Sequence, residues 1–101
     1  MRIAKVVGTV TLNRCHPSFH GARLRLVVPL SLADLRGERQ PQAEEFQPQA
    51  EEMVAWDDQS AGIGNLIAMS EGAEAAQPFR PDLKPVDAYA SAVLDQVEID
   101  K

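Results

Sequence analysis

Gly62 and Gly64 are separated by one residue in the stretch "WDDQSAGIGNLIAMSEG", between two acidic residues and an apolar run. Closely spaced glycines open many loops that bind phosphate groups. A dinucleotide-binding fingerprint needs a third glycine three positions after the second, where this chain has Ile67. A P-loop ends in Gly-Lys-Ser/Thr, but no lysine lies between Lys5 and Lys84. The pattern therefore predicts a turn in which both glycines adopt positive φ or let another backbone approach closely.

Cys15, His16 and His20 form a Cys-His-x3-His cluster whose atoms suit zinc. A closed structural zinc site needs four ligands, and the chain has no further cysteine or histidine, so the fourth would have to be a carboxylate. The same residues supply a thiol and an imidazole, but no local sequence signature of a nucleophile surrounds them. We interpret the cluster as a loop with incidental polar residues and predict neither a metal nor a cofactor.

Asp57 and Asp58 follow Trp56 directly. Adjacent residues of a strand point to opposite faces, so these two carboxylates are not expected to act as an acid–base pair. Trp56 is predicted to anchor the core or an interface. No residue stands out as catalytic, and we do not expect an enzyme.

The composition is that of an ordinary soluble globular domain. The 101 residues are 45% hydrophobic and 25% charged, enough for one domain with one modest core. The single cysteine excludes a disulfide within the chain and fits a reducing compartment. No apolar run is long enough for a membrane span, and the N-terminus lacks the pattern of a signal peptide. We expect a cytoplasmic protein.

The charge is distributed unevenly along the chain. Residues 1–30 contain five basic residues and no acidic residue, whereas the rest has 15 acidic against five basic residues. A basic segment is one signature of nucleic-acid binding. However, Arg23 and Arg25 alternate with leucines, which is typical of one solvated strand face, and only 5% of residues are aromatic. The solvated face is the preferred interpretation.

Runs rich in β-branched and apolar residues predict strands within residues 3–12, 22–30, 53–56 and 66–69. Gly8 suggests a bulge or bend in the first strand, and Pro29 suggests an edge or the end of the second. Residues 13–21 predict the turn between these two strands, because Pro17 and Gly21 interrupt the chain there.

Residues 31–53 are predicted to be a surface insertion within a single domain of residues 1–101. A turn or short helix is expected around Gly37, followed by the tandem repeat "QPQAEEF" and "QPQAEEM" at residues 40–53. Two copies with a proline in each cannot sustain a coiled coil, and their composition favours an extended surface loop.

The C-terminal third contains one ambiguous segment. Residues 70–85 begin with residues that tolerate a helix, which Pro78, Pro81 and Pro85 then stop. Residues 86–99 fit a helix by propensity, with apolar residues at every fourth position, but they also alternate as a strand does.

Three segments resemble the bacterial microcompartment vertex proteins of the EutN/CcmL family. "MRIAKVVGTVTLNRCHPSFHGARLRLVVPL" is similar to the family's opening "IAKVxGTVV" strand, its loop with Pro and Gly, and its "LxLV" strand. "VAWDDQSAGIGNLIAMSEGAEAA" matches the "D-x-x-GAG-x-G-[DE]-x-V-x-x-x-x-G" segment, and "PVDAYASAVLDQVEI" is close to the ending "PVDAxVVxIVDxV". Together they cover most of the chain except about residues 31–53.

The resemblance implies a mainly β fold, a small five-stranded OB-like β-barrel with a short helix, and a strand within residues 86–99. It also implies a non-catalytic homopentamer that caps the vertices of a microcompartment shell in the cytoplasm. Hexameric or trimeric shell proteins would form the facets, and neither nucleic acid nor a membrane would be a partner. The residues that the resemblance places at a subunit interface or axial pore are Ser60, Ala61, Gly62, Ile63, Gly64 and Asn65.

Three positions depart from the family pattern. Ser60 replaces the first glycine of "GAG", and Asn65 replaces an acidic residue suited to accept from neighbouring N–H groups. An arginine that often follows "SxGSSA" has no counterpart before Arg80, so its role does not transfer.

The alternative function is a monomeric OB-like barrel that binds an oligonucleotide or a small ligand. It requires exposed aromatic residues, and several of the five in this chain must fill the core. A small enzyme that uses Cys15 and the histidines ranks last.

Overall fold

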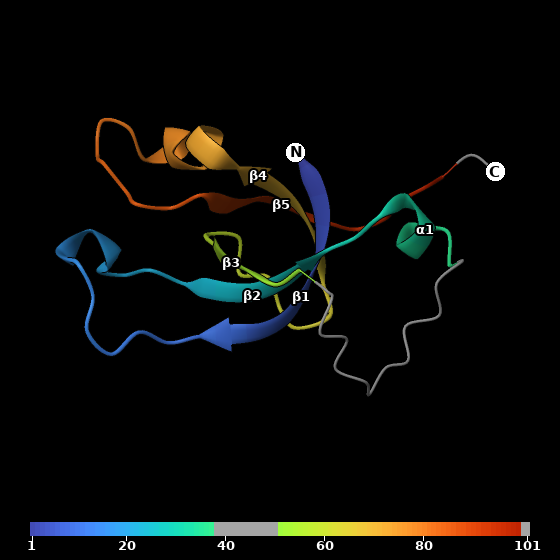
Figure 1. The fold of residues 1–101 in the computed structure, drawn as a ribbon, viewed down its shortest axis with the longest axis horizontal. Coiled ribbons are helices and arrows are strands. Elements are labelled where there is room, and N and C mark those ends of the chain that lie inside the picture. The colour runs from blue at the N-terminus through green and yellow to red at the C-terminus, as the bar shows by residue number, and fades with distance from the viewer. Residues whose placement is uncertain (38–50, 100–101) are drawn as a thin grey trace.

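The computed structural model describes residues 1–37 and 51–99, and within them five strands close into a barrel in the order β1-β2-β3-β5-β4 (Figure 1). This confirms the prediction of a small five-stranded barrel with a short helix. The elements are β1 (Arg2–Val10), the 3-10 helix η1 (Pro17–Phe19), β2 (Leu24–Pro29), α1 (Leu32–Leu35), β3 (Met53–Trp56), β4 (Leu66–Glu71), the 3-10 helix η2 (Gly72–Phe79) and β5 (Ala88–Leu94).

β1 and β2 form the antiparallel hairpin that the sequence predicts. Their register shifts between Val6 and Gly8, which confirms the bulge expected at Gly8. Pro29 ends β2, where a missing N–H removes no hydrogen bond from the ladder. η1 lies in the loop between the two strands, where the His16 side chain accepts a hydrogen bond from the Ser18 N–H.

β5 closes the barrel and settles the ambiguity of residues 86–99 in favour of a strand. It pairs antiparallel with β4 and parallel with β3 through Trp56 and Tyr89. Ala88 and Ala90 lie in the core while Tyr89 between them does not, which is the two-residue period of a strand. Pairing with two neighbours therefore outweighs the helical propensity of these alanines.

The barrel core consists of small side chains because a five-stranded barrel leaves a narrow interior. Ile67 and Met69 from β4 are its largest fully buried apolar members. The remaining cluster is Ala4, Val6, Val27, Ala55, Ala61, Ala88 and Ala90.

A second, aromatic cluster lies beside Trp56, outside the barrel core. The Trp56 ring is 5.9 Å from Phe19 of η1 and 4.8 Å from Phe79 of η2, measured between centroids. Lys84 has its Nζ 5.5 Å from the centroid of the Trp56 ring, and it donates a hydrogen bond to the Ser18 carbonyl at 2.6 Å. The hairpin loop and the loop after η2 are thereby joined at one end of the molecule (Figure 1).

The segment after β2 begins with the predicted short helix. In α1, Ser31 and Asp34 form a reciprocal capping box, and Gly37 follows with φ of 71°. Residues 40–50 of the repeat predicted to form a surface loop lie outside the described residues. At its end the prediction is wrong, because Met53 begins β3 and packs against the core. No helix in the described part of the chain is long and apolar enough to cross a membrane.

Candidate functional site

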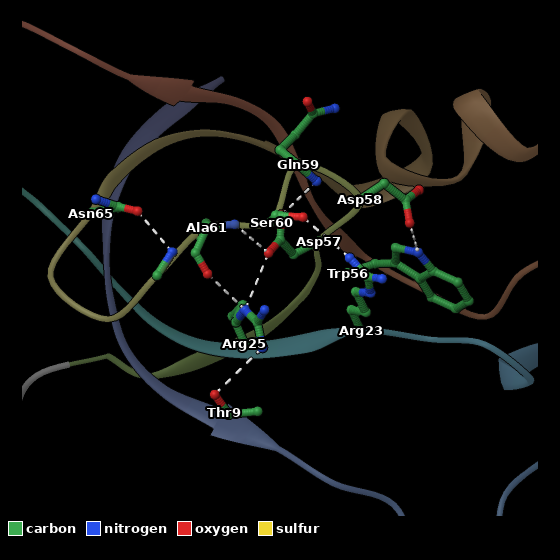
Figure 2. Close-up of polar contacts among 11 residues, drawn as sticks. Thr9, Arg23, Arg25, Trp56, Asp57, Asp58, Gln59, Ser60, Ala61 and Asn65 are labelled. Atoms are coloured by element: carbon green, nitrogen blue, oxygen red, sulfur yellow. Dashed lines mark hydrogen bonds and ion pairs between the residues drawn. The ribbon is translucent and has the colours of Figure 1, made fainter.

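The loop of residues 57–65 joins β3 to β4 across one end of the barrel, and Asp57 holds its first half in place (Figure 2). The Asp57 side chain is fully buried. Its Oδ1 accepts from the Gln59 N–H at 2.8 Å, and its Oδ2 accepts from the Ala61 N–H at 2.8 Å. A buried carboxylate that accepts several N–H groups fixes the backbone that donates them.

Arg25 balances the charge of Asp57 and ties the loop to two strands. Its Nε lies 3.1 Å from Asp57 Oδ2 and 3.0 Å from the Ala61 carbonyl oxygen. Its Nη1 reaches Thr9 Oγ1 on β1 at 3.4 Å. The Arg25 side chain is 19% exposed and that of Asp57 is not exposed at all, so this ion pair is largely removed from solvent. Removing either partner would leave the other as a poorly solvated charge.

The centre of the loop places an alanine in the barrel and a serine in a left-handed conformation. Ala61 is 2% exposed and belongs to the core cluster. Ser60 just before it has φ of 59°, and its Oγ accepts a hydrogen bond from Arg23 Nη1 at 3.2 Å. A non-glycine residue at positive φ persists when its surroundings fix it, and here Asp57 fixes both neighbours of Ser60.

The second half of the loop is a turn from Gly62 to Asn65. The Gly62 N–H donates to Asn65 Oδ1 at 2.7 Å, and the Asn65 N–H donates to the Gly62 carbonyl at 3.0 Å. Gly64 donates to the Val6 carbonyl at 2.8 Å, which joins the turn to β1. Ile63 at the tip is 73% exposed. The Asn65 side chain therefore closes the turn from within the same chain.

Of the two alternatives predicted for the glycines, positive φ or close approach of another backbone, the structure shows positive φ at Gly64 but not at Gly62. Gly64 has φ of 92°, whereas Gly62 is not in the left-handed region, which Ser60 occupies instead. A Cβ at Gly62 would lie 3.4 Å from Asn65 Oδ1, so this position is tight because of one polar side chain. The left-handed residue is Ser60 because Asp57 accepts hydrogen bonds from the N–H groups of Gln59 and Ala61, on either side of it, so the chain turns at residue 60.

The predicted solvated face of Arg23 and Arg25 is also half wrong. Arg23 is exposed, but Arg25 is the partly buried partner of Asp57. The sequence alone does not reveal this pair, because the two residues lie in segments far apart in the chain. The available signal was Asp57 itself, since an aspartate that ends a strand commonly accepts from the N–H two residues later.

Asp58 belongs to the aromatic cluster, apart from Asp57. Its carboxylate accepts from Trp56 Nε1 at 2.9 Å and from the Tyr89 hydroxyl at 3.4 Å. Burial raises the pKa of the Tyr89 phenol, and the adjacent Asp58 carboxylate raises it further. The two carboxylates thus have separate partners, although both residues lie in the loop after β3 and not in the strand on which the prediction was based.

Cys15, His16 and His20 all lie exposed in the hairpin loop. His16 accepts from the Ser18 N–H through Nδ1 at 3.1 Å and caps η1. Across residues 1–37 and 51–99, no three side chains of the ligating types come together as a candidate metal site.

The family described as "Ethanolamine utilisation protein EutN/carboxysome" matches residues 1–95. The carboxysome shell vertex protein CcmL of Gloeobacter violaceus is 33% identical over 100 residues, covering 99% of this chain and 88% of the relative. The microcompartment shell vertex protein GrpN of Rhodospirillum rubrum is 29% identical over 98 residues, 97% of each chain.

Solved structures of these two relatives have the same fold. The Gloeobacter violaceus CcmL structure superimposes with a TM-score of 0.74 at 30% identity, over 99% of this chain and 91% of the other. The Rhodospirillum rubrum GrpN structure, described as a pentameric microcompartment shell protein, gives a TM-score of 0.72 at 26% identity over the whole of both chains.

Proposed function

Because this chain belongs to the EutN/carboxysome family, we propose that it is a structural shell protein that forms a homopentamer and caps the vertices of a bacterial microcompartment. One observation supports this proposal above all. The likeness to named vertex proteins runs over nearly the whole of this chain in both sequence and structure.

The surface of the single chain suits burial against further copies. Several large apolar side chains are exposed on it and would lose contact with water in a ring, which is the main favourable term in association. These residues are Val7 (40%), Leu12 (41%), Leu32 (53%), Val54 (45%), Ile63 (73%), Leu83 (90%) and Val93 (40%).

Within that surface we place the subunit interface, or the rim of an axial pore, at Ser60, Ala61, Gly62, Ile63, Gly64 and Asn65. The backbone of this segment is fixed by hydrogen bonds within its own chain, so it can present the exposed Ile63 without an ordering cost. Small residues on either side of Ile63 would let a neighbouring backbone approach closely.

A structural rather than catalytic role fits how the polar groups are used. Arg25 and Asp57 form a largely buried ion pair that stabilises the 57–65 loop. Asp58 accepts hydrogen bonds from Trp56 and Tyr89. The partners would then be other copies of the chain and the hexameric or trimeric proteins of the shell facets, in the cytoplasm.

The alternative of a nucleic-acid-binding barrel is weakened by the way in which the aromatic rings of residues 1–37 and 51–99 pack on one another. Phe19, Trp56, Phe79 and Tyr89 pack in one continuous series of ring contacts, and Trp56 is only 5% exposed. Aromatic rings used in this way are not free to stack on bases.

We further propose that the chain is one domain and that the segment predicted at about residues 31–53 is a surface insertion up to Met53, where β3 begins. The described start of this segment supports the proposal, since α1 closes its own capping box through Ser31 and Asp34.

Native mass spectrometry and light scattering test the assembly. We expect one species with the mass of five 11.0 kDa chains at micromolar concentration. A stable monomer or dimer would refute the vertex role, and a hexamer would refute it while leaving the barrel in place.

A further inference from the structure

We propose that the cleft between the end of β1, the hairpin loop and the start of β2 is an interface for a second copy of this chain. Arg23 would pair there with a carboxylate of that copy. The inference rests on the proposed pentamer and specifies one side of its subunit contact, which neither the fold nor the relatives assign.

The cleft has the size and lining of a protein contact. Its volume is about 390 Å³, and it opens beside β1 and β2. Val10, Leu12 and Phe19 supply apolar walls, of which Leu12 is 41% exposed in the single chain. None of the residues that line it is acidic. A lone small anion would fill little of this volume and would leave the apolar wall in water.

Arg23 is the cation at this cleft that still needs a counter-charge. Arg25, two residues further along the chain in β2, also lines the cleft but is paired with Asp57 at 3.1 Å. Arg23 is exposed and donates to the neutral Ser60 hydroxyl, and within residues 1–37 and 51–99 it forms no ion pair (Figure 2). A guanidinium with free donors suits a carboxylate, because two parallel N–H groups match its two oxygens.

The opposite charge lies on another part of the same chain. Residues 66–99 carry two bases, Arg80 and Lys84, and Lys84 is already bonded to the Ser18 carbonyl. Against these bases stand five exposed acidic residues, Glu74, Asp82, Asp87, Asp95 and Glu98. Identical subunits in a ring meet head to tail, so each contact joins two different surfaces of the chain. The basic cleft and the acidic residues of η2 and of the segments that flank β5 are complementary in that arrangement.

Charge reversal at two positions of the hairpin tests the role of Arg23. We compare Arg23→Glu with Arg14→Glu, because Arg14 is exposed on the same loop but does not line the cleft. Both variants change the net charge equally. We expect Arg23→Glu to raise the dissociation constant of the ring at least roughly tenfold over Arg14→Glu, since like charges then face each other. Added salt should raise the dissociation constant of the wild-type ring and reduce the difference between the dissociation constants of wild type and Arg23→Glu.

The wild-type chain carries its own probe of whether the cleft is covered. Cys15 lines the cleft and is the only cysteine, so its alkylation by a maleimide reports access. We expect the thiol to react at least roughly tenfold more slowly in the intact ring than in dissociated chains, because a neighbouring subunit excludes the reagent. The matched control is Asn13→Cys with Cys15→Ser, which moves the thiol to an exposed position outside the lining. Its rate should change little on assembly.

The outcomes separate this inference from the proposed function. A monomeric wild-type protein would refute both. A pentamer that tolerates Arg23→Glu as well as Arg14→Glu, with Cys15 equally reactive in ring and free chain, would refute the inference alone. Titration of inorganic phosphate into the intact ring tests the other possible occupant of the cleft, a free anion. Binding that Arg23→Glu abolishes would show that the cleft is open to free anions, and would also overturn the proposal.

Discussion

Trp56 and Asp57 are neighbours at the end of β3, yet they hold two regions of the molecule by different physical means. Asp57 is fully buried and fixes the 57–65 loop through hydrogen bonds to two N–H groups and an ion pair with Arg25. Trp56 points to the other side of the strand and packs against the rings of Phe19 and Phe79.

The two regions should differ in what they tolerate. Hydrogen bonds and ion pairs depend on direction and on a matching partner, and a buried group without its partner is costly. Apolar packing depends mainly on volume and accepts substitutions that conserve it. The polar loop is thus the more specific region, and it is also the one in which we place the subunit interface.

The sharpest break of the polar region is Asp57→Ala. It leaves the Arg25 guanidinium unpaired and the N–H groups of Gln59 and Ala61 without their acceptor. We expect the free energy of unfolding to fall by about 3–5 kcal/mol, measured by urea denaturation at one fixed protein concentration. The control is Asp58→Ala at the adjacent, exposed carboxylate, for which we expect a loss of about 1 kcal/mol. Equal losses would mean that burial of the ion pair contributes nothing.

Two valine substitutions test the turn within the same loop. Gly64→Val places a β-branched residue at φ of 92°, at a cost of about 1–3 kcal/mol in backbone strain. Gly62→Val needs no left-handed residue but crowds Asn65 Oδ1, so we expect about 1 kcal/mol from that one hydrogen bond.

Ring mass and circular dichroism, measured for each variant, separate assembly from folding. We expect both substitutions to impair the ring more than the fold, because the penalty recurs at each subunit contact. A folded, intact pentamer from both variants would show that residues 60–65 lie away from the interface.

Trp56→Phe probes the aromatic region with a conservative change. The phenyl ring keeps most contacts with Phe19 and Phe79 but loses the hydrogen bond from Nε1 to Asp58. We expect a loss of about 1–2 kcal/mol in the urea experiment, below that of Asp57→Ala. A larger loss than at Asp57 would reverse the comparison between the two regions.

The pH dependence of the free energy of unfolding at alkaline pH probes the same aromatic region through Tyr89. Burial and Asp58 raise its pKa above 10.0 in the folded chain, so the unfolded chain releases the phenol proton more readily. This contribution to stability is present below pH 10 and is lost as pH rises through the folded pKa. Ultraviolet titration of phenolate checks the shift directly, because Tyr89 is the only tyrosine. As pH rises above 10, the free energy of unfolding should fall less in Tyr89→Phe than in the wild type. A Tyr89 phenol that titrates below 10.0 would contradict the raised pKa.

The smallest effect is expected where neither region is touched. Deleting residues 40–46 removes one copy of the repeat and leaves "QPQAEEM" before β3. Because closure entropy changes slowly with loop length, we expect a change within about 0.6 kcal/mol and an unchanged ring mass. Loss of soluble assembly would place the repeat at an interface or in the fold.

Local patterns determined most of the barrel in advance. The four strand-like runs occur where predicted, the bulge or bend expected at Gly8 is a bulge, and the turn or short helix expected around Gly37 is the helix α1 just before it. Each of these features depends on residues close in sequence. The separation of Asp57 from Asp58 was also predicted, but on the alternation of a strand, whereas both residues lie in the loop after β3 and are separated by their different partners.

The conformation of the 57–65 loop was decided by tertiary structure. Positive φ at Ser60 instead of Gly62 depends on Asp57, and burial of Asp57 in turn depends on Arg25, 32 residues away in the chain. No local propensity encodes such a pair, because each member is costly to bury until the other is in place. The strand at residues 88–94 has the same origin, since its alanines favour a helix until β3 and β4 lie on either side to complete their hydrogen bonds.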